Sequence, residues 1–524
     1  MTFNDDEEVV KPQEITTGGR KRRPIVSGKT QVTVINKKEA PLEETNLDVL
    51  LKLTGSGDNK DRLGVDLVTV IDVSGSMQEE DKIEKLKVAM QFLIKKLSSI
   101  DRLTVVKFSD SAQRLFPLRQ VTEEAQAKII DEVKALKAGG NTNIADGLRT
   151  ALQVLDDRRF KEGRVGAVML MSDGAENRGK AAEVDVSKVP VHTFGFGANH
   201  DPRVLQEVAK KSNGGTFADV QNDKNLSLAF SQCLAGLLTV VVQDLRLTVK
   251  QFDGDSTILN VFAGNYPQTK NSDNSITIFF GNLYNKEVRN IIVELSLPGV
   301  EDEIGVDVLR VSYTYETGVV GDPLFEANPI KATVTRTGSA SAKELDEIIA
   351  ERNRLTTAKV MKSAREKADE QKLDEAKVML TDAQNSLEDV ETDKPHPVLE
   401  SLKTELQTLL DYMESPETYK KKGRPFALSS ETSHERQRYA ARGDDVGENR
   451  MFATPRMDAL YEQAKEFDKD PDNFKLPTEE EDLKEEIIAD PLGPIIGPLR
   501  YQIQIAIDAL KSIDTILSTA GSAL

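Results

Sequence analysis

The feature that most constrains the fold is a regular exchange of apolar runs and amphipathic helical patterns between residues 65 and 238. Residues 65–72 form a largely apolar run that ends in serine and glycine, and residues 83–99 then carry apolar side chains at helical spacing. Continuous apolar runs of this kind are typical of strands that are buried on both faces, with helices covering them. The first strand and helix of a layered α/β domain are therefore predicted here.

The same alternation continues along the chain. Further strands are predicted at residues 103–108, 112–116, 165–171, 189–196 and 215–220, and further helices at 123–136, 143–155, 202–211 and 226–238. Such an order predicts a doubly wound, mostly parallel α/β sheet over residues 60–240. Ligands of these sheets bind in a crevice beyond the carboxyl ends of the strands.

The regions on either side have the rhythm of an antiparallel sheet. Residues 31–35 and 46–53 alternate between apolar and polar side chains, and six more strand-like runs lie between residues 245 and 336, separated by polar turns. A β-sandwich uses about seven strands. We therefore predict that residues 30–59 and 241–337 form one β-sandwich, into which the α/β domain is inserted.

The rest of the chain is predicted to be helical or irregular. Residues 343–389 contain neither proline nor glycine and have helical periodicity, which predicts a helical bundle over residues 343–413. Residues 414–494 are rich in charge and are predicted to be loop-rich and partly disordered. Residues 495–520 have the apolar stripe of an amphipathic helix, which either packs on the bundle or forms a homo- or hetero-oligomer interface. Residues 1–29 are predicted to be a disordered tail.

Oxygen-bearing side chains follow the first predicted strand and recur in two further loops. Asp72, Ser74 and Ser76 occupy alternate positions, Thr142 precedes a predicted helix, and Asp173 follows the strand predicted at 165–171. Loops at the carboxyl ends of parallel strands meet at one crevice, and carboxylate and hydroxyl oxygens suit a hard cation such as Mg²⁺. Alternatively, Asp72 and the two serines only cap the next helix and stabilise the turn, but this role needs neither Thr142 nor Asp173.

These five residues resemble the metal-ion-dependent adhesion site of von Willebrand factor A (vWA) domains, which have a Rossmann-like fold and include the integrin I domains. The resemblance implies that Ser74, Ser76 and Thr142 supply hydroxyl ligands to Mg²⁺. It also implies that Asp72 and Asp173 hold coordinating waters or approach the ion directly. Mn²⁺ could replace Mg²⁺ because both accept hard oxygen ligands. An acidic side chain of a protein partner would fill the ion's remaining position.

The larger arrangement is similar to the plant vWA proteins related to the WAVY GROWTH group of RING ubiquitin ligases. The matching landmarks are Phe3-Asn4-Asp5-Asp6-Glu7, Ala40-Pro41-Leu42, residues 68–77 and 139–148, and Glu351-Arg352-Asn353-Arg354. In that family a RING, which binds zinc through several cysteines, precedes the acidic segment. This chain has one cysteine, Cys233, so we expect a RING-less relative without ligase activity of its own.

Charge and composition exclude several classes of protein. The formal net charge of −18 argues against nucleic-acid binding, which uses basic surfaces. We find neither a secretory signal nor an apolar run long enough to span a membrane, so a cytoplasmic or nuclear location is expected. The basic cluster at residues 20–23 is either a nuclear-localisation signal or a solvated part of the tail.

The leading hypothesis is an intracellular, non-enzymatic adaptor that recognises a protein partner through its Mg²⁺ site. None of the four histidines lies in a recognisable ligand or triad motif, and no Walker-type phosphate loop is present. No catalytic residue is therefore predicted. Two alternatives stay open, namely a regulator or subunit of a ubiquitin-ligase complex with RING-bearing relatives, and a metal-dependent hydrolase whose ion activates water.

Overall fold

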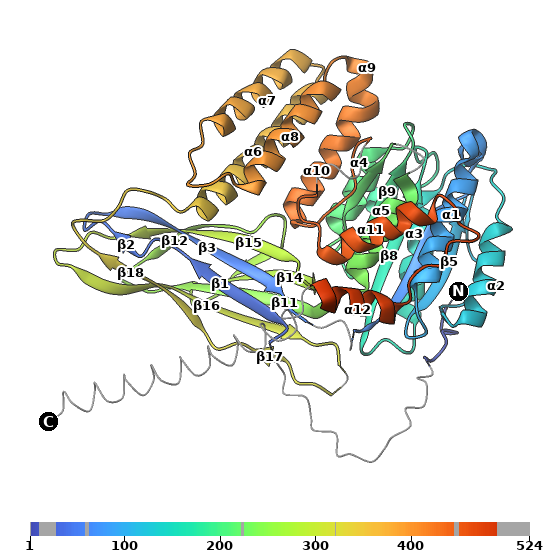
Figure 1. Ribbon diagram of the computed structural model, residues 1–524, viewed down its shortest axis with the longest axis horizontal. Coiled ribbons are helices and arrows are strands. Elements are labelled where there is room, and N and C mark those ends of the chain that lie inside the picture. The colour runs from blue at the N-terminus through green and yellow to red at the C-terminus, as the bar shows by residue number, and fades with distance from the viewer. Residues whose placement is uncertain are drawn as a thin grey trace.

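The computed structural model describes residues 2–9, 28–57, 62–221, 225–319, 321–444 and 450–489. These residues form a β-sandwich, an α/β domain beside it and a group of helices that reaches over both (Figure 1). The α/β domain lies in the chain between the strands of the sandwich. The predicted fold class, a doubly wound sheet inserted in a β-sandwich and followed by helices, is confirmed.

A seven-stranded sheet forms the centre of the α/β domain. Its order is β10-β9-β8-β4-β5-β6, and β7 also pairs with β5. Neighbours from β10 to β5 are parallel, whereas β6 and β7 are antiparallel to β5. The strands are β4 (Gly64–Asp72), β5 (Arg102–Phe108), β6 (Ala112–Arg114), β7 (Arg119–Gln120), β8 (Arg164–Ser172), β9 (Val191–Phe196) and β10 (Phe217–Val220).

Helices cover both faces of this sheet. One face is covered by α1 (Lys82–Lys96), α2 (Glu123–Lys134) and α5 (Leu226–Leu237), and the other by α3 (Ile144–Asp157) and α4 (Pro202–Lys211). The central strand β4 is buried throughout, with Val65 and Leu67 in one core and Val68 and Val70 in the other. Burial on both faces explains why its sequence does not alternate. Two 3-10 segments, η2 (Gly75–Asp81) and η3 (Ala181–Glu183), lie in loops.

Two sheets form the β-sandwich, with orders β1-β3-β15-β12 and β13-β14-β11-β16-β18-β2, and β17 pairs with β16. The strands before the α/β domain are β1 (Thr30–Ile35), β2 (Glu39–Ala40) and β3 (Thr45–Gly55). Those after it are β11 (Val240–Gln251), β12 (Thr257–Phe262), β13 (Gln268–Lys270), β14 (Ile276–Tyr284), β15 (Val288–Leu297), β16 (Ile304–Glu316), β17 (Phe325–Glu326) and β18 (Ile330–Arg336). Because β3 pairs with both β1 and β15, strands from the two sides of the insertion share one sheet.

The first helices after the sandwich are α6 (Asp346–Asp369), α7 (Leu373–Glu388) and α8 (Pro397–Tyr412). Ala364, Leu380 and Leu406, one from each helix, lie in a common apolar core. This packing agrees with the apolar periodicity of their sequence, because residues three and four apart share one face of a helix.

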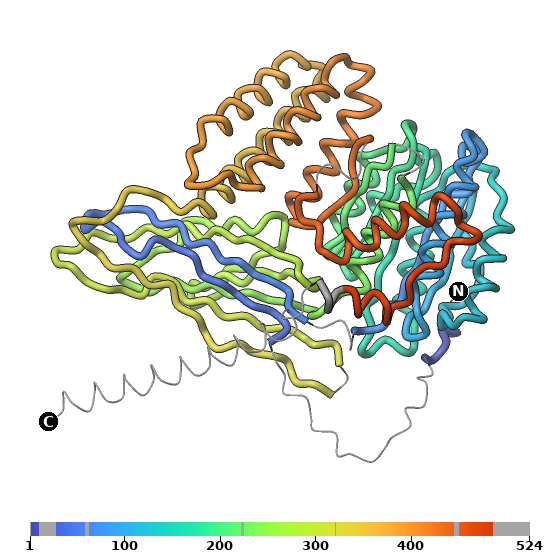
Figure 2. Tube along the Cα trace, viewed as in Figure 1, coloured from blue at the N-terminus to red at the C-terminus, as the bar shows by residue number. Residues whose placement is uncertain are grey.

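Residues 414–489 differ from the prediction of a loop-rich segment. They contain α9 (Pro416–Thr418), a π-helical turn (Tyr419–Gly423), α10 (Arg424–Arg436), α11 (Pro455–Phe467) and α12 (Glu479–Ala489). The chain returns to the α/β domain, where α11 lies on α5 (Figure 2) and Leu460 and Phe467 enter the core. Most of the buried residues of α10 are polar. The sequence did not indicate a buried helix here because hydrogen bonds replace apolar contacts. For example, Ser429 donates to the Phe217 carbonyl at 2.9 Å.

One buried ion pair after α10 joins the three parts of the structure. The Arg438 guanidinium donates to the Glu287 carboxylate at 2.7 and 3.0 Å, in the turn between β14 and β15 of the sandwich. It also donates to the carbonyl of Gly214, before β10 of the α/β domain, at 2.8 Å. The side chains of Arg438 and Glu287 are 2% and 1% exposed. The sandwich, the α/β domain and the helical region are therefore connected through a single guanidinium.

A second buried ion pair lies inside the helical region. The carboxylate of Glu405, on α8, lies 2.9 Å from Arg442 and 2.9 Å from His434, and all three side chains are almost fully buried. Burial alone would raise the pKa of the Glu405 carboxyl. The charges of Arg442 and His434 outweigh it and lower the pKa to about 2.

We expect the Glu405 pair to make the protein sensitive to acid. A carboxyl whose pKa falls from 4.5 to about 2 on folding contributes stability above pH 4.5, and this contribution is lost as the pH falls toward 2. Glu405→Gln should lower the free energy of unfolding in urea by about 3 kcal/mol at pH 7, and the loss should shrink below pH 4. Glu400→Gln, on the exposed side of α8, is the control. A loss that stays the same from pH 3 to pH 7 would contradict this assignment.

The amino-terminal end of the chain also departs from the sequence prediction. Residues 2–9, predicted to belong to a disordered tail, lie against the α/β domain, and Asp6 is buried there. The basic cluster at 20–23 and the amphipathic helix predicted at 495–520 lie outside the described residues. Within the described ranges, every helix is too short or too polar to cross a bilayer.

Candidate metal centre

The five residues proposed from the sequence as metal ligands stand on three loops at the carboxyl end of the sheet. Asp72 ends β4, and Ser74 and Ser76 follow it. Asp173 comes directly after β8, the parallel neighbour of β4. Thr142 lies in the loop before α3. Because β4 and β8 are adjacent and parallel, their ends meet at the same edge of the sheet.

Hydrogen bonds bring four of these side chains together. The Ser76 hydroxyl donates to the Asp173 carboxylate at 2.7 Å, and the hydroxyl oxygens of Ser74 and Ser76 are 3.1 Å apart. Asp72 accepts a hydrogen bond of 2.8 Å from the backbone N–H of Ser74. Asp72, Ser74 and Asp173 are almost fully buried, whereas Ser76 is partly exposed.

The fifth residue, Thr142, lies close to Ser76, as the surroundings of Gly174 show. A Cβ atom added to Gly174 would lie 3.5 Å from the Ser76 hydroxyl oxygen and 3.8 Å from that of Thr142. The two hydroxyls therefore border one small space, which stays open because Gly174 has no side chain. A larger residue at this position would extend a side chain into that space.

Hydrogen bonds from two backbone N–H groups hold the Thr142 loop in place. The N–H of Gly139 donates to the carbonyl of Val73 at 2.7 Å, which joins this loop to the loop after β4. The N–H of Thr142 donates to the side-chain oxygen of Asn177 at 3.0 Å. The loop after β8, which carries Asn177, thus contacts the Thr142 loop directly.

The two carboxylates have different electrostatic surroundings. Burial raises the pKa of Asp72 to about 6, although the hydrogen bonds from Ser74 and Ser172 act in the opposite direction. Asp173 instead forms an ion pair of 2.9 Å with Lys82, and the two side chains are 0% and 3% exposed. The site therefore contains two carboxylates and one ammonium, and the hydrogen bonds to Asp72 come from neutral donors.

This donor set fits a hard divalent cation. Mg²⁺ is usually held by one or two carboxylates and keeps several of its waters. Asp72 and Asp173 would supply the charge, and the hydroxyls of Ser74, Ser76 and Thr142 would supply neutral ligands. Across the described part of the chain, no three His, Cys, Asp or Glu side chains gather in a way that could hold a metal. A carboxylate-rich or zinc-type centre is therefore absent from these residues.

Three residues that contact the site were not predicted from the sequence. The Ser172 hydroxyl donates to Asp72 at 2.7 Å, Lys82 pairs with Asp173, and Asn177 binds the backbone of Thr142. Ser172 stands directly before Asp173, so its position was a usable signal. Lys82 follows Asp72 by ten positions, and no pattern in the sequence indicates where its long side chain ends.

Comparison with known proteins identifies the domain that carries this site. Residues 66–232 match the family model of the von Willebrand factor type A domain, and residues 396–466 match the model described as VWA / Hh protein intein-like. The fold and the family model together define a vWA-domain protein. A solved von Willebrand factor type A protein from Catenulispora acidiphila shares the fold, with a TM-score of 0.58 at 17% identity, covering 74% of this chain and 89% of that one.

More particularly, the chain is homologous to a group of plant proteins. E3 ubiquitin-protein ligase WAV3 of Arabidopsis thaliana is 31% identical over 260 residues, which cover 46% of this chain and 32% of WAV3. Probable E3 ubiquitin-protein ligase WAVH2 of the same plant is 26% identical over 299 residues, covering 52% of this chain and 40% of WAVH2. The chain thus spans less than half the length of these relatives.

These relatives contradict one expectation from the sequence. The chain was expected not to be an enzyme, yet WAV3 and WAVH2 are both named as ubiquitin-protein ligases, which are enzymes. The expectation was based on the absence of catalytic motifs and of the cysteines that a RING requires.

Proposed function

We propose that this chain is a protein-binding component of a ubiquitin-ligase system, and that its vWA domain recognises a partner through Mg²⁺ held by Asp72, Ser74, Ser76, Thr142 and Asp173. The observation that carries this proposal is the meeting of three loops around one small space lined by hydroxyls and buried carboxylates. Mn²⁺ is the expected substitute ion. The proposed location is the cytoplasm or the nucleus.

An acidic side chain of the partner would complete the ion's coordination. Hydroxyl ligands are neutral, so the ion keeps much of its charge and attracts a carboxylate. The surroundings favour the same chemistry. A cavity of about 570 Å³ opens beside Ala175, two residues after Asp173, and extends to the start of α10. Its charged lining residues are four basic and two acidic, with Asp201 and Glu417 opposed by Arg203, Lys420, Lys421 and Arg424.

The direct test is a titration of the whole chain with Mg²⁺, followed by calorimetry. The wild type should bind about one ion per chain, and the double substitution Ser74→Ala/Ser76→Ala should remove binding. Ser187→Ala, at an exposed position of the same domain, is the matched control and should bind normally. Equal Mg²⁺ binding by the wild type and the double variant would contradict the proposed site. Partner capture from plant extract with and without Mg²⁺ then tests the adhesive role.

Lys82 offers a sharper test because it shares Asp173 with the proposed ion. An ammonium a few ångströms from a divalent cation repels it, and burial strengthens the repulsion. Lys82→Met should therefore bind Mg²⁺ at least about tenfold more tightly, since removing one nearby charge is worth more than about 1.4 kcal/mol in a partly buried site. The same variant should have a lower melting temperature without metal, because Asp173 loses its partner.

The control for this prediction is Lys85→Met, which removes the same charge from the same helix. The Lys85 amine donates to the carbonyl of Glu80. Its substitution should leave the affinity for Mg²⁺ nearly unchanged. Weaker Mg²⁺ binding by Lys82→Met would show that Lys82 supports the ion and would overturn the expected competition.

A second candidate function is assembly with RING-bearing relatives in one ligase complex, which is favoured by the homology to WAV3 and WAVH2. In this case the contact would involve the helical region from residue 343 onward and would not depend on Mg²⁺. Co-purification with such a relative in the presence of a chelator distinguishes the two functions. Loss of the complex in the chelator would favour the metal site as the point of contact.

A further inference from the structure

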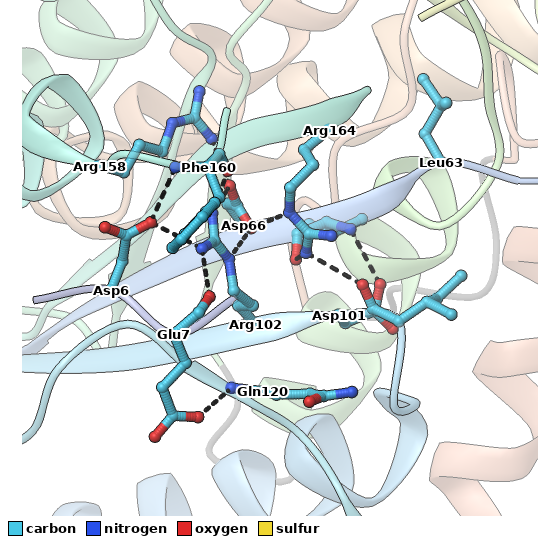
Figure 3. A network of polar contacts seen from close by, with 12 residues as sticks. Asp6, Glu7, Leu63, Asp66, Asp101, Arg102, Gln120, Arg158, Phe160 and Arg164 are labelled. Carbon is cyan, nitrogen blue, oxygen red and sulfur yellow. Dashed lines mark hydrogen bonds and ion pairs between the residues drawn. The ribbon is translucent and has the colours of Figure 1, made fainter. Parts of the chain in front are cut away.

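The acidic segment Phe3–Glu7 lies against the α/β domain far from the metal centre. It contacts the amino-terminal end of the sheet, where Asp66 stands near the start of β4, whereas Asp72 ends the same strand. Six residues of strand separate these two levels, which is roughly 20 Å. The contacts made by the segment are therefore independent of the metal site. Figure 3 shows the segment's Asp6 and Glu7 beside Arg102.

Asp6 is the central contact of the segment. Its carboxylate accepts a hydrogen bond of 2.7 Å from Arg102 and bonds of 2.9 and 3.1 Å from the backbone N–H groups of Arg159 and Phe160. It is 2% exposed. Burial would raise the pKa of Asp6, but these donors outweigh it and lower the pKa. The pocket is thus built to hold a carboxylate in its charged form.

The positive charge of this pocket exceeds what the α/β domain itself neutralises. Three guanidiniums, those of Arg102, Arg158 and Arg164, bond the one carboxylate of Asp66 at 2.6–2.8 Å. Arg102 is completely buried, and its remaining donors reach Asp6, the carbonyl of Glu7 and the carbonyl of Phe160. The segment therefore provides a counter-charge that the arginine cluster lacks (Figure 3). A buried cation without a partner is costly.

The residues beside Asp6 give the contact its sequence specificity. Asp5 forms a two-point ion pair with Arg114 at 2.6 and 2.7 Å, and the same guanidinium lies 4.3 Å from the centre of the Phe3 ring. The Glu7 carboxylate accepts a hydrogen bond of 2.9 Å from the backbone N–H of Gln120. The backbone N–H of Glu7 donates to a carbonyl of the domain at 3.0 Å. Arg114 thus contacts both Phe3 and Asp5, whereas the carboxylates of Asp6 and Glu7 are bound by other groups of the domain.

From these contacts we propose that the amino-terminal end of the vWA sheet is a peptide-docking site for segments of the form Phe-x-Asp-Asp-Glu. In this chain it holds the chain's own residues 3–7, and it accepts the same segment from a second polypeptide. Recognition of acidic motifs by arginine clusters is a general mode of peptide binding. In the sequence, residues 10–27 lie between the segment and the sandwich, so the segment competes with any free copy as a covalently attached ligand.

The covalent attachment of the segment determines how the exchange is measured. An attached ligand acts at an effective concentration of about millimolar, so a free peptide competes poorly with it. Removal of residues 1–9 should therefore open the site. The labelled peptide Thr2–Val9 should bind this shortened chain at least ten times more tightly than it binds the full-length chain, as measured by fluorescence anisotropy.

Variants of the peptide test the chemistry of recognition. Substitution of Asp6 by asparagine in the peptide should reduce binding at least about tenfold, because the buried charge-assisted hydrogen bonds are lost. On the protein, Arg114→Ala should weaken binding through Phe3 and Asp5, whereas Arg178→Ala, a half-exposed arginine on the loop of the metal centre, should not. Addition of Mg²⁺ or a chelator should have no effect.

A second variant protects the test against misfolding of the shortened chain. Full-length Asp6→Asn keeps every residue and should release the attached segment, so that it binds the wild-type peptide like the shortened chain does. The melting temperature of each protein shows that it is folded. If neither folded variant binds the peptide, or if the Asp6→Asn peptide binds as well as the wild type, the docking site is refuted. Binding in the presence of chelator keeps this result separate from the fate of the proposed metal site.

Discussion

Asp66→Ala should lower the free energy of unfolding by about 3–5 kcal/mol, which is the usual loss when one partner of a buried ion pair is removed. Asp66 is fully buried and bonds three guanidiniums. Its loss leaves Arg102, Arg158 and Arg164 close together with Asp6 as the main remaining counter-charge. Asp66→Asn keeps the shape but not the charge and should be nearly as unstable, because repulsion among the arginines is the main cause.

Urea unfolding of the whole chain, followed by circular dichroism, measures this loss. The control is Glu124→Ala, which breaks the exposed pair between Glu124 and Lys128 on α2 and should change stability little. If Asp66→Ala lowers the free energy of unfolding by less than about 1 kcal/mol, solvent or Asp6 compensates for the missing carboxylate. The arginine cluster would then not need Asp66 as a counter-charge.

Arg438→Met should lower the free energy of unfolding about as much as Asp66→Ala does, and it should also uncouple the domains. The substitution keeps much of the side-chain volume but leaves Glu287 buried beside Arg289 alone, which again costs about 3–5 kcal/mol. It also removes the bond from Arg438 to the Gly214 carbonyl of the α/β domain. We therefore expect the thermal unfolding of the chain, recorded by calorimetry, to change from one transition to two.

Arg438→Lys tests whether geometry or charge is responsible. A lysine restores the charge, but it lacks the planar guanidinium that donates to two carboxylate oxygens and a carbonyl at once. It should therefore recover only part of the lost stability. Arg246→Met removes a half-exposed arginine of the sandwich, which pairs with Asp244, and should leave the transition unchanged. A single, unshifted transition in Arg438→Met would show that the domains are coupled elsewhere.

The α/β domain and the placement of Asp72 and Asp173 at one edge of its sheet could be predicted from the sequence, because both follow from local patterns. The continuous apolar run of residues 65–72 and its repeats determine a buried parallel sheet. The order of the strands then places Asp72 and Asp173 at one edge. The residues that adjust the site's charge could not be predicted in this way. Lys82, the first residue of α1, pairs with Asp173, which lies 91 positions further along the chain, and no spacing in the sequence indicates this contact.

Regions of low hydrophobicity were predicted least well. Residues 2–9 and α10 contain few apolar side chains, so their sequence favoured a tail and a loop. In the structure their burial is supported by polar partners, as with Asp6 on Arg102 and Ser429 on the carbonyl of Phe217. Those partners are distant in the chain, 96 residues for Asp6 and Arg102 and 212 residues for Ser429 and Phe217. Composition describes the average residue of a segment and does not detect individual charge pairs of this kind.

The insertion of the vWA domain between β3 and β11 limits how the domain can turn. A domain attached by one linker can swivel around it, whereas two connections to the same neighbour allow bending and oppose rotation. The second connection is short, since only Leu238 and Thr239 separate α5 from β11. The face that carries Asp72 and Thr142 therefore keeps a set direction relative to the sandwich. A partner bound there would therefore be held at a fixed angle relative to the sandwich.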